Sequence, residues 1–230
     1  MLAPLLVSAV LLTGAAGAPP DAALVAALRA KVPLDAIDLQ GDPYEAWRDR
    51  EPPRSPPGTV CGVRFEPDRI HYRLATFPGE AAARAAGFSV THLGSCGTCS
   101  TMQDLAVYLE RPDLTAPVRR CGVLHPTEAG TIACLLRLGF SAACARTWYF
   151  DVRNTRRECL GVCLLAWIER EPSTTGPDRQ LNPCLRCDEE RSGPVFKAVA
   201  GRTRRDSGIP SSIARPDAEI AHVVHDYVPR

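Results

Sequence analysis

Residues 91–110 read THLGSCGTCSTMQDLAVYLE, and the fold can be predicted outward from this stretch. A short strand over 88–92 leads into a glycine-containing turn that carries Cys96 and Cys99, and an amphipathic helix over 100–110 follows. This order places Cys99 at a helix N-terminus, where unpaired amide groups and the helix dipole stabilise a thiolate. Because the thiolate is the nucleophilic form of cysteine, Cys99 is the first candidate catalytic residue.

The segments on both sides of this stretch alternate between strand and helix patterns. Beyond those named above, the predicted strands are 59–65, 70–76, 193–199 and 220–224, and the predicted helices are 22–31, 80–86, 127–138 and 156–169, the last after a polar break at 153–155. This mixture predicts an α+β fold. We expect a central cysteine-bearing helix packed with disulfide-linked helices and a small, mostly antiparallel sheet.

Ten cysteines lie in the chain of 230 residues, and an even count in an exported protein indicates a disulfide framework. Cys159 and Cys163 lie one turn apart on a predicted helix, so each should bond to a cysteine of another segment. Two C-x-x-C pairs would suggest a zinc site in a cytosolic protein, and export makes this the minority hypothesis. Besides Cys99, the candidates for disulfides are Cys61, Cys96, Cys121, Cys134, Cys144, Cys159, Cys163, Cys184 and Cys187.

Export is predicted from the N-terminus, where residues 1–18 are a predicted signal peptide, an apolar run that ends in an Ala-Gly-Ala cleavage pattern. Residues 19–58 contain no cysteine and are either a detachable, pro-like arm or a packed N-terminal lobe, and 59–230 form the cysteine-rich domain. We expect a secreted or lumenal protein that is soluble after cleavage, with no membrane partner. The formal net charge is +1, which gives no reason to expect a nucleic-acid partner.

The segment 94–100, GSCGTCS, resembles the active-site turn of papain-like cysteine proteases. A second, distant stretch between 193 and 227 is similar to the family's segment around the catalytic histidine, with His222 at the matching position. The resemblance implies that Cys96 is bridged to another cysteine and that Cys99 is the nucleophile. It also implies that His222 is the general base that takes the thiol proton.

Two further residues could complete such a site. Leu93 stands where the family has the glutamine that donates to the oxyanion, so His92 could supply that donor instead. Asp226 could orient His222, because residues four apart on a strand share one face. The candidate catalytic set is therefore Cys99, His222, His92 and Asp226.

Three arginines, Arg202, Arg204 and Arg205, form a candidate substrate clamp, since guanidinium groups bind carboxylate or phosphate through paired donors. The alternative is a solvated cluster that pairs with acidic neighbours in 188–190. The sequence suggests no cofactor and no metal.

Three functions follow from these patterns. The leading hypothesis is a secreted cysteine-nucleophile enzyme that hydrolyses amides or esters or transfers an acyl group, with a peptide or a small acyl or anionic substrate. The second is a non-catalytic, disulfide-rich extracellular binding or structural module. The third is a thiol–disulfide oxidoreductase that uses Cys96 and Cys99. The first needs a free Cys99 thiol, and the second has all ten cysteines bonded.

Overall fold

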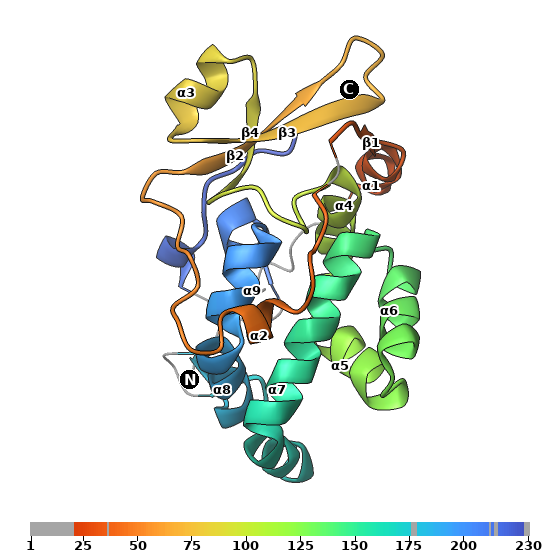
Figure 1. The fold of residues 1–230 in the computed structure, drawn as a ribbon, viewed down its shortest axis with the longest axis vertical. Coiled ribbons are helices and arrows are strands. Elements are labelled where there is room, and N and C mark those ends of the chain that lie inside the picture. Colours follow the sequence, from red (N-terminus) through yellow and green to blue (C-terminus); the bar gives the residue numbers. More distant parts are fainter. Residues whose placement is uncertain (1–20, 36, 176–178, 212, 214–215, 228–230) are drawn as a thin grey trace, which may run out of the picture.

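The computed structural model describes residues 21–35, 37–175, 179–211, 213 and 216–227. It shows an α+β fold in which a small sheet lies at one end of a body of helices (Figure 1). The predicted fold class is confirmed. The predicted signal peptide, 1–18, lies outside the described residues.

The main sheet has the order β1-β3-β2-β4, and β2 pairs antiparallel with both β3 and β4 while β1 adds to β3 in parallel. Its strands are β1 (Val32–Pro33), β2 (Val60–Phe65), β3 (His71–Phe77) and β4 (Ser89–Leu93). A separate antiparallel pair joins β5 (Thr174–Thr175) to β6 (Gln180–Leu181). Tyr72 of β3 is buried, and its hydroxyl oxygen accepts a hydrogen bond from the Met102 amide (3.0 Å), which anchors the sheet to the helical body.

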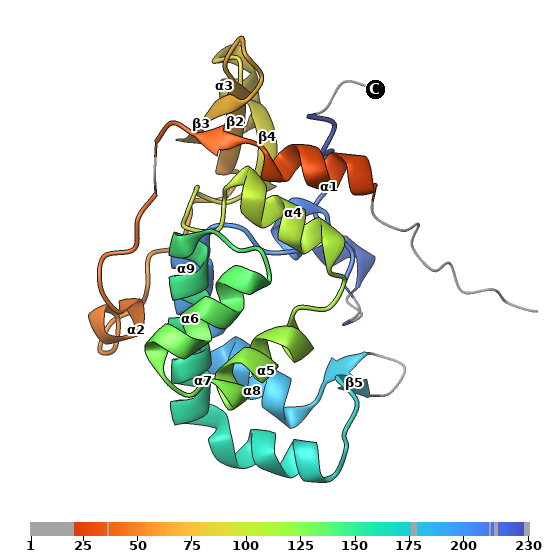
Figure 2. The ribbon, with the colours of Figure 1, turned by 90° about the vertical axis from the view of Figure 1, so that its right-hand side faces the viewer.

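The longest helix, α7 (Ala142–Ile168), runs through the helical body. The other helices are α1 (Ala22–Arg29), α2 (Pro43–Ala46), α3 (Glu80–Ala85), α4 (Met102–Glu110), α5 (Thr115–Leu124), α6 (Glu128–Arg137), α8 (Pro183–Arg191) and α9 (Gly193–Ala200). Figures 1 and 2 show α5 and α6 on one side of α7 and α8 and α9 on another. In the described part of the chain, no helix combines the length and the apolar composition that a bilayer crossing requires.

Side-chain caps explain where several of these helices begin. Ser141 accepts from the Cys144 amide at the start of α7, and Thr127 and Asn182 cap α6 and α8 in the same way. The start of α6 agrees with the sequence prediction to within one residue.

Three predicted segments were wrong. Residues 193–199 form α9 and not a strand, because Pro194 is tolerated in a first helical turn and Val195 and Val199 share one helix face. Residues 221–227 have no regular secondary structure. The polar break at 153–155 is absent, and α7 passes through it without interruption.

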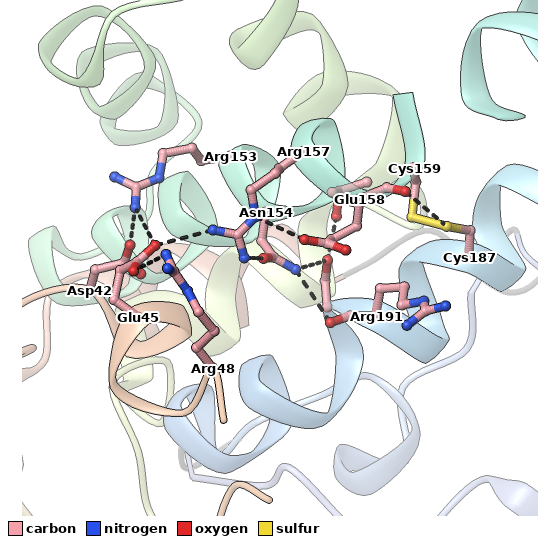
Figure 3. Close-up of polar contacts among 12 residues, drawn as sticks. Asp42, Glu45, Arg48, Arg153, Asn154, Arg157, Glu158, Cys159, Cys187 and Arg191 are labelled. Carbon is pink, nitrogen blue, oxygen red and sulfur yellow. Dashed lines mark hydrogen bonds and ion pairs between the residues drawn. A yellow bond between two sulfur atoms is a disulfide. The ribbon is translucent and has the colours of Figure 1, made fainter. Parts of the chain in front are cut away.

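The described residues of the N-terminal segment, 21–35 and 37–58, contact the body through α1, β1 and α2. Leu28 of α1 is fully buried in the main hydrophobic core, and β1 joins the sheet. Figure 3 shows α2 held on α7 by ion pairs, in which Arg157 lies 3.1 Å and Arg153 3.8 Å from the Glu45 carboxylate. This segment therefore contacts both the sheet and the helices.

Candidate functional site

All ten cysteines lie within the described residues, and all are paired. The bonds are Cys61–Cys96, Cys99–Cys144, Cys121–Cys134, Cys159–Cys187 and Cys163–Cys184. The predicted disulfide framework is confirmed. So is the expectation that Cys159 and Cys163 bond elsewhere, since both tie α7 to α8.

The structure contradicts a catalytic Cys99 in this oxidised form, because its buried sulfur is bonded to that of Cys144. Its predicted position was also wrong: α4 begins at Met102 after the cap residue Thr101, so Cys99 lies outside the helix. The Cys99 amide donates to the Ala200 carbonyl oxygen (2.9 Å) and is not available to an oxyanion.

The oxidoreductase and zinc hypotheses fail for a related reason. Cys96 is bonded to Cys61 and not to Cys99, so the C-x-x-C turn does not close a redox disulfide. The sulfurs of Cys184 and Cys187 are used in bonds to α7, which leaves no thiolate there for a metal ion.

His92 stabilises the turn and does not face a substrate. It is fully buried, its Nδ1 contacts the Leu93 carbonyl oxygen (2.8 Å), and its Nε2 contacts the Ser100 hydroxyl (2.7 Å). A carbonyl can only accept, so Nδ1 donates and Nε2 accepts in the neutral tautomer. Burial, followed by the charge of Arg202, holds the His92 pKa well below its ordinary value of 6.5. The imidazole therefore remains neutral, and the predicted oxyanion role is wrong.

His222 and Asp226 are both exposed on the irregular C-terminal segment, so the argument that placed them on one strand face was wrong. The partly buried histidine of this segment is His225, whose Nε2 donates to the Ser207 carbonyl oxygen (2.8 Å). Burial and the nearby Arg202 lower the pKa of His225 to about 4.

Arg202 was predicted to clamp a substrate, but it is completely buried and is the largest side chain in the core. Its guanidinium donates five hydrogen bonds of 2.7–3.2 Å, all to uncharged acceptors. These acceptors are the carbonyl oxygens of Thr91, Cys99 and Ser100 and the hydroxyls of Thr91 and Ser207. The Arg202 side chain thus joins β4, the turn that contains Cys99 and the segment that contains Ser207. Its role is therefore structural.

The two other arginines differ from each other. Arg205 pairs with Glu189 (3.1 Å) and Glu219 (2.9 Å), which is the solvated cluster that the sequence left open as an alternative. Arg204 donates through Nη1 to the Pro210 carbonyl oxygen (2.9 Å), and its guanidinium carbon lies 5.7 Å from the centre of the Tyr108 ring.

Arg204 and Arg205 line a groove of about 780 Å³ between α5, α7, α8, α9 and residues of the segment 203–211, which we call the α7 groove. A volume in this range is typical of small-molecule sites. Its walls are mostly apolar, with Leu114, Val118, Val152, Leu160, Leu164 and Phe196 among the lining side chains.

One end of the α7 groove is open to solvent at the last turns of α7. Trp167 is 70% exposed there, Leu160 is 59% exposed and Leu164 is 50% exposed. Groove-lining residues extend back along the same helix to Trp148, about 28 Å at the rise of an α-helix. The groove therefore extends along most of α7.

Two carboxyl groups line the α7 groove, the buried one of Asp151 and the partly buried one of Asp188. Asp151 accepts from the Tyr44 hydroxyl (2.7 Å), and Asp188 accepts from Thr155. Burial raises the pKa of both groups, and the charge of Asp188 raises that of Asp151 further. These two acids are thus already hydrogen-bonded within the fold and are less readily ionised than an exposed carboxyl.

Sequence reasoning missed the α7 groove because α5 and α8 were not predicted as helices. A usable signal was present on α7, where Leu160, Leu164 and Trp167 recur at helical spacing.

Residues 128–223 match the model of a family of unknown function (DUF8771). The matched range runs from α6 into the C-terminal segment, so it includes α7, α8, α9 and Arg202 and excludes the turn with Cys96 and Cys99. Neither the curated proteins nor the solved structures give a match.

Proposed function

We propose that this chain is a secreted or lumenal, non-catalytic binding module that holds a small apolar ligand in the α7 groove. The observation that carries the proposal is the groove itself, about 780 Å³ and lined mainly by apolar side chains between four helices. An apolar ligand that enters it would remove its own surface and the groove walls from water, at about 25 cal/mol for each Å² buried.

The disulfides support the same function. Cys163–Cys184 and Cys159–Cys187 tie α7 to α8, and both α7 and α8 form walls of the α7 groove. Two covalent ties between these walls keep the site formed before the ligand arrives, which lowers the entropic cost of binding. Disulfides persist in oxidising compartments, which supports a secreted or lumenal location.

Leu164 and Val162 allow a matched test, because both are exposed on α7, at 50% and 42%, and of the two only Leu164 lines the groove. The neutral dye Nile red would be titrated into the native, disulfide-bonded protein, with dye fluorescence as the signal. We expect saturable binding that Leu164→Glu weakens at least tenfold, since it places a charge on an apolar wall. Val162→Glu should leave the affinity unchanged.

The proposal is wrong if the native protein gives no saturable binding. It is also wrong if the two substitutions weaken binding equally, because the dye would then bind a general apolar surface.

A further inference from the structure

The last turns of α7 form an exposed apolar surface. Residues 159–168 contain no charged side chain, and six of them are large, apolar and between 42% and 70% exposed: Leu160, Val162, Leu164, Leu165, Trp167 and Ile168. We call these six residues the α7 tip. Single exposed apolar residues are ordinary on soluble proteins, but a contiguous set of them marks a surface that meets another apolar phase or molecule.

The α7 tip lies at the end of the molecule away from the main sheet (Figures 1 and 2). At about 3.6 residues per turn, its six side chains span about 220° of the helix circumference. The remaining arc carries Cys159, Cys163 and Ala166, and disulfides join the two cysteines to α8. Covalent bonds therefore hold this end of the helix on one side and leave most of its circumference apolar and exposed.

Four exposed arginines lie beside the α7 tip. Three of them line the α7 groove together with Trp167, and the fourth lines an adjoining hollow with Trp167 and Ile168; they are Arg119, Arg120, Arg156 and Arg170. None of the four forms an ion pair with another described residue.

The acidic residues nearby do not balance these arginines. Glu158 is paired with Arg157 (2.8 Å), and Glu189 is paired with Arg205 (3.1 Å). Asp151 and Asp188, inside the α7 groove, are hydrogen-bonded to Tyr44 and Thr155. Glu169 and Glu171 follow the helix directly. Four arginines therefore stand against two acidic residues, and the charge around the α7 tip is positive.

These features favour a lipid bilayer over a second copy of the chain. In a two-fold dimer the same surface meets itself, so the arginines would face their own copies. An anionic bilayer offers acyl chains that surround a helix on several sides and phosphates that pair with guanidinium groups. Tryptophan is enriched where these two regions meet, and Trp167 is the most exposed side chain of the α7 tip.

We infer that the α7 tip docks on the surface of an anionic lipid bilayer, with its apolar side chains among the acyl chains and the four arginines at the head groups. The uncharged run 159–168 is about half as long as a membrane span, so the tip lies in the interface and does not cross the bilayer. Docking goes beyond the proposed function, since it does not require an occupied groove. It replaces the expectation, drawn from the sequence, of no membrane partner.

The test sediments the native, disulfide-bonded protein with two kinds of vesicle, phosphatidylcholine alone and equal parts of phosphatidylcholine and phosphatidylglycerol. We expect the mixed vesicles to bind the protein at least about tenfold more tightly, since each arginine near an anionic surface contributes about fivefold. Added sodium chloride should weaken this binding. Absence of binding to the mixed vesicles, or equal affinity for both kinds, would overturn the inference.

Leu165→Glu and Ile168→Glu test the apolar contact, with Ile70→Glu as the matched control. Ile168 is 64% exposed, and Ile70, in the turn between β2 and β3, is 49% exposed. Each substitution in the α7 tip should weaken binding to the mixed vesicles at least about tenfold, and the control should leave it unchanged. Equal losses in all three variants would contradict docking through the α7 tip. If one tip variant fails to fold, the other decides the question.

Arg170→Gln and Arg69→Gln form a matched pair for the charge, because both residues are exposed arginines with a positive φ, 54° and 58°. Arg170→Gln should lower the affinity for the mixed vesicles about fivefold and leave that for phosphatidylcholine unchanged. Arg69→Gln should change neither affinity. Equal affinities of the two variants for the mixed vesicles would contradict the placement of Arg170 at the head groups.

Nile red titration separates failure of docking from failure of the proposed function, because Leu165 and Ile168 do not line the α7 groove. Saturable Nile red binding by a protein that does not sediment with vesicles would overturn docking alone. Vesicle binding without Nile red binding would overturn the proposed function alone. Sedimentation velocity tests the second copy: we expect a monomer, and a dimer that Ile168→Glu dissociates would overturn docking on a bilayer.

Discussion

Arg202→Met should destabilise the fold by about 3–5 kcal/mol. The substitution keeps an unbranched apolar stem of similar shape and removes all five donors. The hydroxyls of Thr91 and Ser207 can rotate, but the carbonyl oxygens of Thr91, Cys99 and Ser100 lose a donor inside the core. Each unsatisfied carbonyl costs about 1–3 kcal/mol, and the relief of no longer burying a guanidinium offsets part of the sum.

The assay is urea denaturation of the disulfide-intact protein, followed by far-ultraviolet circular dichroism. Arg202→Lys retains the charge but has three donors for five acceptors, so it should fall between wild type and Arg202→Met. Arg186→Met, at an exposed position, should lie within about 0.5 kcal/mol of wild type. A free energy of unfolding for Arg202→Met within about 1 kcal/mol of wild type would refute the structural role of Arg202.

Three further predictions concern the buried polar groups and the disulfides. The pKa of His225 in the folded protein is lowered from 6.5 to about 4, so wild-type stability should be lost as the pH falls from 6.5 towards 4. The stability of His225→Gln relative to wild type should therefore rise by up to about 3 kcal/mol over that range. A difference in stability that does not change with pH would contradict this prediction. Tyr108→Phe should change the free energy of unfolding by no more than about 1 kcal/mol, since the buried hydroxyl that it deletes has Trp148 beside it but no well-aligned hydrogen bond among the described residues, and a larger loss would show a strong hydrogen bond there. Replacing both Cys163 and Cys184 by serine should cost about 2–5 kcal/mol and weaken Nile red binding, and an unchanged melting temperature would show that this disulfide does not stabilise the fold.

Local patterns in the sequence were enough to predict much of the fold. The strands β2, β3 and β4 and the helices α3, α4 and α6 follow from alternation, helical spacing and glycine positions within a few residues. The separate bonding of Cys159 and Cys163 also followed from their spacing, because two cysteines one helical turn apart are poorly placed to bond each other.

Other features depend on tertiary contacts that no local pattern contains. Asn154 looked like part of a helix break, but its side chain donates to the Ser192 hydroxyl (3.1 Å) of the α8–α9 junction, and α7 continues through it. The mostly apolar residues 195–199 fit both a strand and a buried helix. In the structure they are helical, and the Phe196 ring packs on Trp148 of α7 with the ring centres 4.5 Å apart.

The candidate site was the least predictable part. Arginines are almost always at the surface, so no local pattern placed Arg202 in the core or separated its role from those of Arg204 and Arg205. The partner of Cys99 lies 45 residues away on α7, and disulfide pairing cannot be deduced from spacing in a chain with ten cysteines. The resemblance to papain-like proteases therefore led to a nucleophile whose sulfur is in a disulfide.

The most direct test of the account is peptide mapping of the native protein without reduction, after treatment with iodoacetamide at neutral pH. A non-catalytic module with a closed disulfide framework predicts no alkylated cysteine and a disulfide-linked peptide that contains Cys99 and Cys144. Alkylation of Cys99 in the folded protein would contradict the account and would favour the hypothesis of a cysteine-nucleophile enzyme.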